Sequence, residues 1–324
     1  MKYNALIIGA GQLGSRHMQG LLKLKDPINV FIVDPSLSSL EIAASRAKEI
    51  DHQHDLHFST EWNELPNSFD LVIVATNSNV RAEIIIKLLN NYIIKYLILE
   101  KVLFQNIESY KIISDLLFKN SVKVWVNHPR RMSKEYQSLK SLLQQGSNKN
   151  FQVTGVDWGL GCNGLHFIDL FVYLTESRVK NIDAEWVDSE IKESKRNGFI
   201  EFTGSIKGIL EDNSSFVITS HKGDANACTI TIFDKIKRFV VFESITPRII
   251  EFSIGKEIKE TSLPLSLNFQ SSLTQNLAEE LLKYGTCDLP TYEEARHSHE
   301  QFISALLNKF NQITGVIHNN LPIT

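Results

Sequence analysis

The sequence predicts two domains: an α/β domain with a doubly wound parallel sheet, and then an α+β domain with a large, mostly antiparallel open sheet. Three observations favour this fold class. Short apolar runs alternate with helical patterns at the start of the chain, a glycine-rich turn follows the first run, and strand-like stretches with tight turns fill the second half. A length of 324 residues suits two domains. We place them at residues 1–126 and 127–324, with the two C-terminal helices able to pack back on the first domain.

The expected strands of the first domain are apolar on both faces, which is typical of a parallel sheet covered by helices on both sides. These strands lie at residues 5–9, 30–34, 71–76, 96–100 and 122–126. Helical patterns separate them at residues 12–24, 37–49, 80–89 and 108–118. The regular alternation of strand and helix predicts the doubly wound sheet.

The second domain begins with a helix at residues 134–143, a strand at 151–158 and a helix at 163–174. Further strands are expected at residues 200–203, 206–210, 215–220, 229–233, 239–242 and 249–254, and two last helices at 271–284 and 292–310. The turn Asp212-Asn213-Ser214 and the step at Gly204-Ser205 suggest hairpins, so the sheet is expected to be largely antiparallel.

The composition excludes several classes of protein. With 43% apolar and 22% charged residues the chain is an ordinary globular protein, and a net charge of −3 does not suit a duplex nucleic-acid binder. No apolar run reaches the ~18 residues of a transmembrane helix, and the N-terminus does not resemble a signal peptide. Cys162, Cys228 and Cys287 form no Cys-x-x-Cys pair, so we expect no metal site, no disulfide framework and a reducing cytoplasm.

The turn after the first strand carries a G-x-G-x-x-G pattern that starts at Gly9 and in which Gly11 and Gly14 enclose Gln12 and Leu13. Its place between a buried strand and a helix is the context of a dinucleotide-binding turn. The first glycine permits the tight turn, the second lets the backbone approach a pyrophosphate, and the third allows close packing of helix on strand. The phosphates would then lie at the positive end of the helix dipole. The alternative is a tight turn that binds no ligand.

Asp34 ends the second predicted strand, twenty residues after Gly14. An acidic residue at this place binds the adenosine ribose diol and repels the 2′-phosphate of NADP. Because no Arg or Lys follows closely, we predict that the cofactor is NAD. One alternative is an aspartate that caps the next helix, although Ser36 could cap it equally well. A methyltransferase would also use a glycine-rich turn and an acidic strand end.

Polar residues stand at the ends of two further predicted strands: Thr76 and Asn77 at one, Glu100 and Lys101 at the other. Residues at the carboxyl ends of strands face the ligand crevice of an open α/β sheet. We therefore expect these four residues to contact the cofactor. A lysine there can also stabilise the alkoxide that develops as hydride leaves. The alternative for Glu100 and Lys101 is a solvated pair of loop residues.

A further motif lies at residues 159–169, where a glycine-rich loop leads into a helix that starts with a His-x-x-Asp pattern. Taken with the glycine turn and its extension to His17, with Asp34 and with the Glu100-Lys101 pair, this order of motifs resembles the glucose–fructose oxidoreductase / inositol dehydrogenase / MocA (Gfo/Idh/MocA) family over almost the full chain. The resemblance implies an NAD-binding Rossmann domain and a second domain whose open sheet contacts another subunit. A homodimer or homotetramer is therefore expected.

The resemblance also implies roles for particular residues. Lys101 matches the lysine of the family's Glu-Lys-Pro motif, beside the nicotinamide and the substrate, and His166 matches the histidine of its Asp-x-x-x-His motif, which transfers the substrate proton. Two positions depart from the family: Val102 replaces the proline and Cys162 replaces the aspartate. Asn163 shares a helix face with His166, so it can take over the polar role and contact the substrate.

The partner of His166 and the role of two arginines stay open. Asp169, one turn downstream, could hold the tautomer of His166 or serve only as a capping residue. The first turn of a helix disfavours the imidazolium, so a neutral imidazole suits a general base; the alternative is a hydrogen-bonded histidine under the sheet. Arg130 and Arg131 at the domain junction could grip a carboxylate or phosphate of the substrate, or form a salt-bridged hinge.

Together these features predict an NAD-dependent oxidoreductase that acts on a secondary hydroxyl, or the matching ketone, of a small-molecule carbohydrate: a sugar, a sugar acid or a cyclic polyol. By resemblance alone, its place is in bacterial surface-sugar metabolism. His166 would take the hydroxyl proton while Lys101 stabilises the developing alkoxide. The departures at positions 102 and 162 keep two alternatives open, namely an NAD-binding regulator or scaffold without turnover, and an NAD-dependent lyase of the same fold.

Overall fold

The computed structural model describes residues 2–144, 146–225, 227–235, 237–244, 246–254, 257–266 and 269–324. The chain divides into two compact units, and each is formed by several segments of the chain. The first unit comprises Met1–Phe104, Glu108–Pro129 and Asn268–Glu293. The second unit comprises Gln105–Ile107, Arg130–Leu267 and Glu294–Thr324. A segment near the C-terminus thus belongs to the N-terminal unit.

The first unit contains a six-stranded sheet in which neighbouring strands are parallel, in the order β3-β2-β1-β4-β5-β6. The strands are β1 (Asn4–Ile8), β2 (Asn29–Val33), β3 (Asp55–Ser59), β4 (Ser68–Val74), β5 (Ile93–Leu99) and β6 (Lys123–Val126). The central strands β1, β4 and β5 are apolar and buried toward their carboxyl ends, as helices on both faces of a sheet require. The predicted doubly wound parallel sheet is confirmed.

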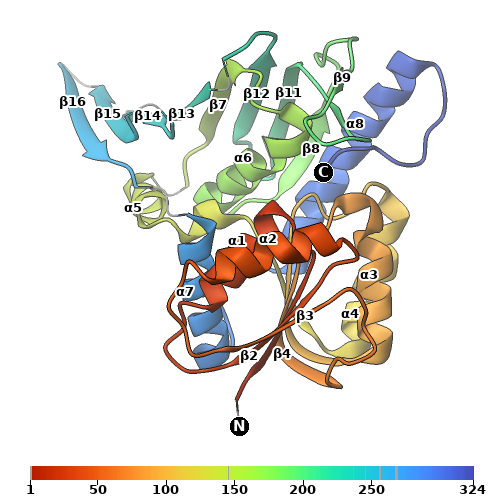
Figure 1. Cartoon of the computed structure of the whole chain (residues 1–324). Helices are drawn as coiled ribbons and strands as arrows, with labels where there is room; N and C mark the ends of the chain where they lie inside the picture. The colour runs from red at the N-terminus through yellow and green to blue at the C-terminus, as the bar shows by residue number, and fades with distance from the viewer. Residues whose placement is uncertain are drawn as a thin grey trace. The chain divides into compact units, whose positions relative to one another are not determined.

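Helices follow the strands of this sheet, and one more reaches it from the C-terminal part of the chain. They are α1 (Gln12–Leu21), α2 (Leu37–Ala47), α3 (Ser78–Asn91), α4 (Ile107–Asn120) and α7 (Gln270–Tyr284). Although α1 and α7 are far apart in the sequence, they lie side by side (Figure 1). Gly20 allows this close packing, because a Cβ atom there would lie 2.6 Å from the carbonyl oxygen of Ser271.

The second unit contains an eight-stranded sheet in the order β16-β15-β14-β13-β7-β12-β11-β8. Its strands are β7 (Lys149–Val156), β8 (Val179–Asp183), β11 (Gly204–Leu210), β12 (Ser215–His221), β13 (Ala227–Asp234), β14 (Lys237–Phe242), β15 (Arg248–Ile254) and β16 (Ile258–Pro264). Neighbouring strands are antiparallel except for β7 and β12. The predicted mostly antiparallel sheet is confirmed, with one parallel pair at its centre.

A two-stranded ribbon and several helices complete the second unit. The strands β9 (Lys192–Glu193) and β10 (Ile200–Glu201) form a separate antiparallel ribbon. The helical elements are η1 (Pro129–Met132), α5 (Lys134–Leu142), α6 (Leu160–Thr175) and α8 (Tyr292–Thr314). Figure 1 shows α6 lying along one face of the large sheet, and α6 packs on β7 and β12.

The strand register gives the large sheet one covered face and one open face. A buried row crosses the sheet through directly paired residues: Ile206, Ile218, Val153, Ile230, Val241 and Ile249. The neighbouring row points to the opposite face and is partly or fully exposed: Lys207, Val217, Gln152, Thr231, Val240 and Ile250. Because side chains alternate between faces along a strand, this second row lines the open side of the sheet.

One predicted hairpin is confirmed and another is wrong. Asn213, with φ 65°, lies in the tight turn that joins β11 to β12. The step at Gly204, by contrast, joins no hairpin, because β10 pairs with β9 rather than with β11. Gly204 instead has φ +96° and passes so close to another loop that a Cβ atom would lie 2.7 Å from the amide nitrogen of Asp188. Backbone proximity, rather than a turn, therefore accounts for this glycine.

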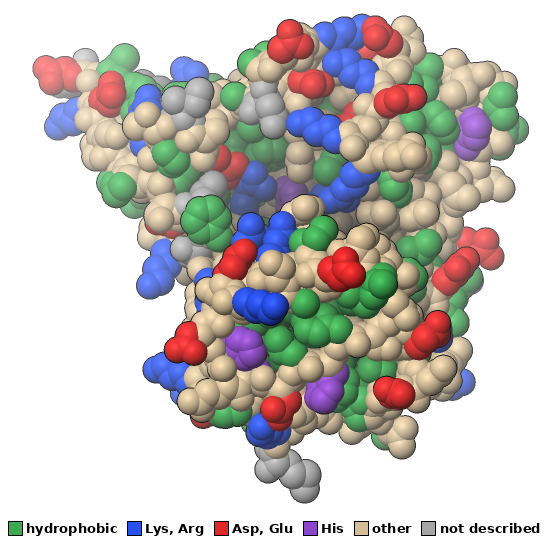
Figure 2. Space-filling view, viewed as in Figure 1, with side chains coloured by type: hydrophobic (Ala, Val, Ile, Leu, Met, Phe, Trp, Pro, Cys, Tyr) green, Lys and Arg blue, Asp and Glu red, His purple; other side chains and the backbone are tan. Residues whose placement is uncertain are grey.

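The visible face of each unit carries basic, acidic and apolar side chains interspersed (Figure 2). Within the described ranges, no helix combines the length and the apolar character that crossing a membrane requires.

Candidate cofactor site and candidate catalytic groups

The three glycines of the first turn have different surroundings. Gly9 has φ +96°, a conformation that favours glycine, and a Cβ atom on Gly14 would overlap the carbonyl oxygen of Gly9. A Cβ atom on Gly11, in contrast, would meet no atom within 4 Å. The first and third glycines are therefore required by the fold, whereas the space beside Gly11, at the N-terminus of α1, can receive a ligand. This arrangement fits a pyrophosphate.

Asp34 lies directly beside this turn. Its Oδ2 accepts a hydrogen bond from the Ala10 amide at 2.6 Å, and its Oδ1 accepts one from the Ser36 amide at 2.8 Å. Ser36 is the residue that caps α2, because its hydroxyl accepts a bond from the Ser39 amide at 3.3 Å. The carboxylate of Asp34 thus joins the end of β2 to the glycine turn, which is where an acidic residue meets the adenosine ribose.

Arg46 is a neighbour of this turn that the sequence did not indicate. It extends from the last turn of α2 to the start of α1, where its guanidinium donates to the carbonyl oxygen of Gln12 at 3.3 Å. It also donates to the side chains of Gln12 and Ser15. The packing of α2 on α1 creates this contact, so no local pattern after Asp34 could reveal it.

The loop after β4 holds Thr76 and Asn77. Thr76 Oγ1 is buried and has no hydrogen-bond partner in the described part of the chain. Asn77 precedes α3, is exposed and makes no side-chain capping bond. A buried hydroxyl at the carboxyl edge of the sheet needs a partner, and a polar group of a bound nucleotide can supply it.

Arg81 connects this loop to the segment that follows Lys101. The side chain is 1% exposed, and it donates to the carbonyl oxygens of Thr76 and Val102 and, at 3.1 Å, to that of Leu103. The peptide bond between Lys101 and Val102 is cis. Arg81 therefore holds together the ends of two strands that flank the predicted nicotinamide site.

Glu100 points into the first unit. Its Oε1 lies 2.8 Å from His17 Nε2 and accepts a bond from Asn127 Nδ2 at 2.5 Å. Burial opposes ionisation of Glu100, but the hydrogen bond and charge of His17 and the bond from Asn127 outweigh it and hold the carboxyl pKa below its ordinary value. The side chain predicted to contact the cofactor is thus engaged inside the unit, while the next residue, Lys101, is half-buried.

The second unit carries His166, Asn163 and Cys162 in the first two turns of α6. His166 is half-buried. Asn163 Nδ2 donates to the Trp158 carbonyl oxygen at 2.6 Å. The Cys162 amide donates to Glu201 Oε1 at 2.8 Å, so a carboxylate from β10 covers the start of α6. No motif of the sequence indicates Glu201 as a site residue.

Asp169 and the two arginines are engaged in ion pairs. Arg131 binds Asp169 through two bonds, Nε to Oδ2 at 2.9 Å and Nη2 to Oδ1 at 2.8 Å. Burial raises the pKa of the Asp169 carboxyl, and the charge of Arg131 only partly offsets this. Arg130 binds Glu243 at 2.7 Å through Nε and stacks 4.5 Å from the ring centroid of Phe167. The guanidinium that was expected to grip substrate is thus paired within the second unit.

Tyr136 completes the cluster around Glu243. Its hydroxyl donates to Glu243 Oε1 at 2.5 Å. Burial opposes ionisation of Glu243, but the charge and bonds of Arg130 and the bond from Tyr136 hold the carboxyl pKa below its ordinary value. The arginines are therefore better described as structural members of buried clusters than as free anion ligands.

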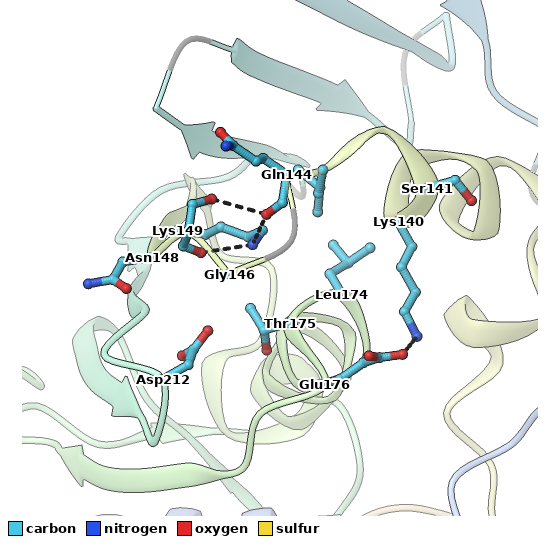
Figure 3. A pocket seen from close by; sticks show the side chains of 12 residues that line it. Lys140, Ser141, Gln144, Gly146, Asn148, Lys149, Leu174, Thr175, Glu176 and Asp212 are labelled. Atoms are coloured by element: carbon cyan, nitrogen blue, oxygen red, sulfur yellow. Dashed lines mark hydrogen bonds and ion pairs between the residues drawn. The ribbon is translucent and has the colours of Figure 1, made fainter.

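A pocket of about 470 Å³ lies elsewhere in the second unit, where α5, α6 and the start of β7 approach one another (Figure 3). Its lysines are engaged by the protein. Lys140 Nζ lies 2.7 Å from Glu176, and Lys149 Nζ donates to the carbonyl oxygens of Gln144 and Ser147 at 2.9 Å. Since none of the predicted site residues lines it, we do not place the candidate site there.

The predicted groups are thus divided between the units. The first unit contains the glycine turn, Asp34, Thr76, Asn77, Glu100 and Lys101. The second unit contains Arg130, Asn163 and His166. Among the described residues, no group of three or more His, Cys, Asp or Glu side chains is arranged to hold a metal ion.

These features define the first unit as a dinucleotide-binding domain. Residues 3–128 match the Gfo/Idh/MocA family model, described as an oxidoreductase family with an NAD-binding Rossmann fold. Residues 3–128 therefore form an NAD-binding Rossmann domain of the kind found in the Gfo/Idh/MocA oxidoreductases, and the cofactor is NAD. No curated protein matches the chain by sequence.

Solved structures share the fold of the whole chain. UDP-N-acetylglucosamine 3-dehydrogenase from Acidithiobacillus ferrooxidans is 13% identical, with a TM-score of 0.71 over 94% of this chain and 97% of that one. An oxidoreductase from Agrobacterium radiobacter, in complex with NAD+, L-tartaric acid and magnesium, is 14% identical, with a TM-score of 0.71 over 97% and 99%.

A third similar structure is that of a super-repressor mutant of Gal80p from Saccharomyces cerevisiae. It is 14% identical, with a TM-score of 0.73 over 99% of this chain and 100% of that one. At such identities the likeness concerns the fold, which is shared by proteins with different functions.

Proposed function

We propose that the protein is an NAD-dependent dehydrogenase or reductase that acts on a secondary hydroxyl, or the matching ketone, of a sugar, sugar acid or cyclic polyol. The observation that carries the proposal is the position of Lys101. It follows the buried Glu100 at the carboxyl end of β5, the same edge of the sheet that holds the glycine turn and Asp34. A cation at this edge is suited to stabilise an alkoxide.

The cofactor groups of the proposal are residues of the first unit. Gly9, Gly11, Gly14 and the first residues of α1, Gln12 and Leu13, form the turn that would bind the pyrophosphate. Asp34 would bind the ribose diol, and Thr76 and Asn77 would line the nicotinamide side. Glu100 supports this site from inside, because it ties the end of β5 to α1 through His17.

Bound NAD supplies the acceptor for the hydride that leaves the substrate carbon. The hydroxyl proton passes to the neutral imidazole of His166. The positive charge of Lys101 stabilises the alkoxide that forms on the substrate as this proton leaves. Asn163 orients the substrate beside His166, since the two positions share a face of α6. In the reverse direction the same imidazole returns the proton to the ketone.

The substrate class rests on resemblance and on the relatives. One structure with the same fold is a dehydrogenase of a nucleotide-linked amino sugar, and another was obtained with a hydroxy acid. They support a nucleotide-linked or acidic sugar as the first class to test, and the place in bacterial surface-sugar metabolism rests on the resemblance alone. The open face of the second unit's sheet supports a homodimer or homotetramer, because half-exposed branched side chains on a sheet face are stabilised by a covering partner.

The second candidate function is an NAD-binding regulator without turnover. Cys162 stands where the resemblance expects an acidic partner of His166, and a Gal80p variant shares the fold. NADH fluorescence and absorbance with a panel of sugars, sugar acids and polyols would separate the two. A dehydrogenase changes NADH concentration with at least one class of compound. Tight NADH binding with no change for any of them would favour the regulator.

A further inference from the structure

The start of α6 is covered by a carboxylate from a different part of the second unit. Glu201 Oε1, from β10, accepts the Cys162 amide at 2.8 Å. Glycines on both sides make room for it: a Cβ atom on Gly159 would lie 2.8 Å from Glu201 Oε2, and one on Gly161 would lie 2.5 Å from Oε1. The glycine-rich loop before α6 is thus shaped around this carboxylate.

The other candidates for an acidic or polar partner of His166 have different partners. The side-chain amide of Asn163 donates to the carbonyl oxygen of Trp158, and the guanidinium of Arg131 binds both carboxylate oxygens of Asp169. Cys162 has its sulfur 3.9 Å from Asn163 Oδ1 and supplies no carboxylate. Glu201 is the carboxylate that the structure brings to the helical turn of Cys162.

His166 lies one helical turn after Cys162. Side chains on an α-helix lean toward its N-terminus, so the imidazole at position 166 leans over the turn that Glu201 covers. The positive end of the helix dipole disfavours an imidazolium at this place, and a carboxylate there offsets that effect. An imidazole that must accept a substrate proton benefits from such a charge.

We propose that Glu201 is a positioning residue for His166, and that it supplies from β10 the negative charge that the chain lacks at position 162. This inference rests on the proposed role of His166 as the base. Three nearby charged groups on adjoining elements are engaged in ion pairs. Asp157, before α6, lies 3.1 Å from Lys192 of β9, and Arg130 and Arg131 bind Glu243 and Asp169. Among these groups, Glu201 is the carboxylate with a bond to the backbone at the start of α6.

The test is a titration of His166 by NMR in the full-length protein, with histidine labelled and the signal assigned through His166→Asn. Glu201→Gln keeps an oxygen for the Cys162 amide but removes the charge. We expect it to lower the measured His166 pKa by about half a unit to one unit.

Cys162→Asp in the Glu201→Gln background should restore at least half of the shift in the His166 pKa. Glu193→Gln, on the exposed partner strand of the same ribbon, is the matched control and should change nothing.

An unchanged His166 titration in a folded Glu201→Gln variant would overturn the inference. If that variant does not fold, the double variant with Cys162→Asp decides: a His166 pKa within about half a unit of the parental value supports the inference, and a larger decrease refutes it. The readout requires no substrate. Should the protein prove to lack turnover, the proposed function fails while the titration still reports on Glu201. With a substrate, Glu201→Gln should lower kcat by about tenfold and shift the acidic limb of the pH profile in the same direction.

Discussion

His17 and Glu100 form a buried pair that joins α1 to the end of β5, with Nε2 and Oε1 2.8 Å apart and side-chain exposures of 0% and 4%. On its other side, His17 Nδ1 lies 2.8 Å from the hydroxyl of Thr274 in α7. Since α1 follows the glycine turn and Lys101 follows Glu100, this pair fixes the nucleotide-binding turn and the candidate lysine relative to one another. It also explains why the Glu-Lys pair is not a solvated loop pair.

Breaking this pair should destabilise the first unit strongly. His17→Ala leaves the Glu100 carboxylate buried with one partner fewer, and such a loss costs about 3–5 kcal/mol. The pKa of Glu100 is lowered in the folded protein, so its stabilisation is present above the unfolded value of about 4.3 and is lost as the pH falls through the folded pKa. Urea unfolding of the parent and of Glu100→Gln between pH 3 and 7 measures this loss of stability.

The exposed Lys2–Asp55 pair provides the control, since Lys2→Ala should change the free energy of unfolding little. A His17→Ala variant as stable as the parent would contradict the assignment.

Substitutions of two glycines should separate folding from cofactor binding. Gly14→Ala places a Cβ atom against the Gly9 carbonyl oxygen, so the variant should unfold at markedly lower temperature. Gly11→Ala meets no protein atom within 4 Å and should keep or slightly raise the melting temperature of the protein without cofactor. It should nevertheless weaken NAD binding by tenfold or more, because the methyl group occupies the pyrophosphate's place. Calorimetry and NADH fluorescence give the two readouts, and parental NADH affinity in Gly11→Ala would remove this turn from the cofactor site.

Asp34 should determine the choice between NAD and NADP. We expect NAD(H) to bind at least tenfold more tightly than NADP(H), which corresponds to ~1.4 kcal/mol. Asp34→Asn keeps an acceptor oxygen for one of the Ala10 and Ser36 amides, loses the other acceptor, and removes the charge that repels the 2′-phosphate. The substitution should narrow the difference in affinity between NAD(H) and NADP(H), mainly by strengthening NADP(H) binding. Fluorescence titrations of both cofactors decide the matter, and equal affinities in the parent would refute the role.

Lys101 and His166 should act on turnover rather than on cofactor affinity. Lys101→Ala and His166→Ala should each lower kcat by roughly 10² to 10⁴, while NAD affinity stays within a few-fold of the parent. The double variant should lose less than the product of the two, because groups that act as a unit are not additive. Removing His166 should flatten the acidic limb of the pH profile, since a base must be deprotonated to accept a proton. Full turnover with an unchanged profile in His166→Ala would make His166 a packing residue.

Charge on the open face of the second unit's sheet should disrupt the expected oligomer. Val217 lies in the half-exposed row of that face, so Val217→Lys introduces a cation into the proposed interface. Sedimentation velocity should show a dimer or tetramer for the parent and a smaller species for the variant. Phe118→Lys, at a position that is 89% exposed in the first unit, is the control and should leave the mass unchanged. A monomeric parent would refute the interface.

The fold could be predicted wherever burial leaves a pattern in the sequence. β1, β4 and β5 end in continuous apolar runs because helices cover both faces of their sheet, and the glycine turn marks where β1 ends. β3 and β16 were not predicted. β3 is a short edge strand in which two apolar residues, Leu56 and Phe58, alternate with polar ones, and every residue of β16 is exposed, so neither carries a long hydrophobic pattern.

The candidate site was predictable only in part, for a different physical reason. The glycine turn and Asp34 are recognisable because a dinucleotide demands a fixed spacing in one βαβ unit. Arg46 and Glu201 reach their places through the packing of separate elements, which leaves no spacing to read. Buried partners from distant parts of the chain also bind Glu100, Asp169 and Arg130. The motifs alone therefore could not predict how far these three side chains are buried.

The placement of α7 beside α1 has a consequence for how the chain is made. The first unit needs Asn268–Glu293 to cover α1 and to give His17 its Thr274 partner, so the unit remains incomplete on the ribosome until most of the chain has been synthesised. A fragment that ends near residue 129 would expose the Gly20 face of α1 to solvent and to chaperones. Expression of the isolated nucleotide-binding unit would therefore require the C-terminal segment to be grafted on, for example by circular permutation.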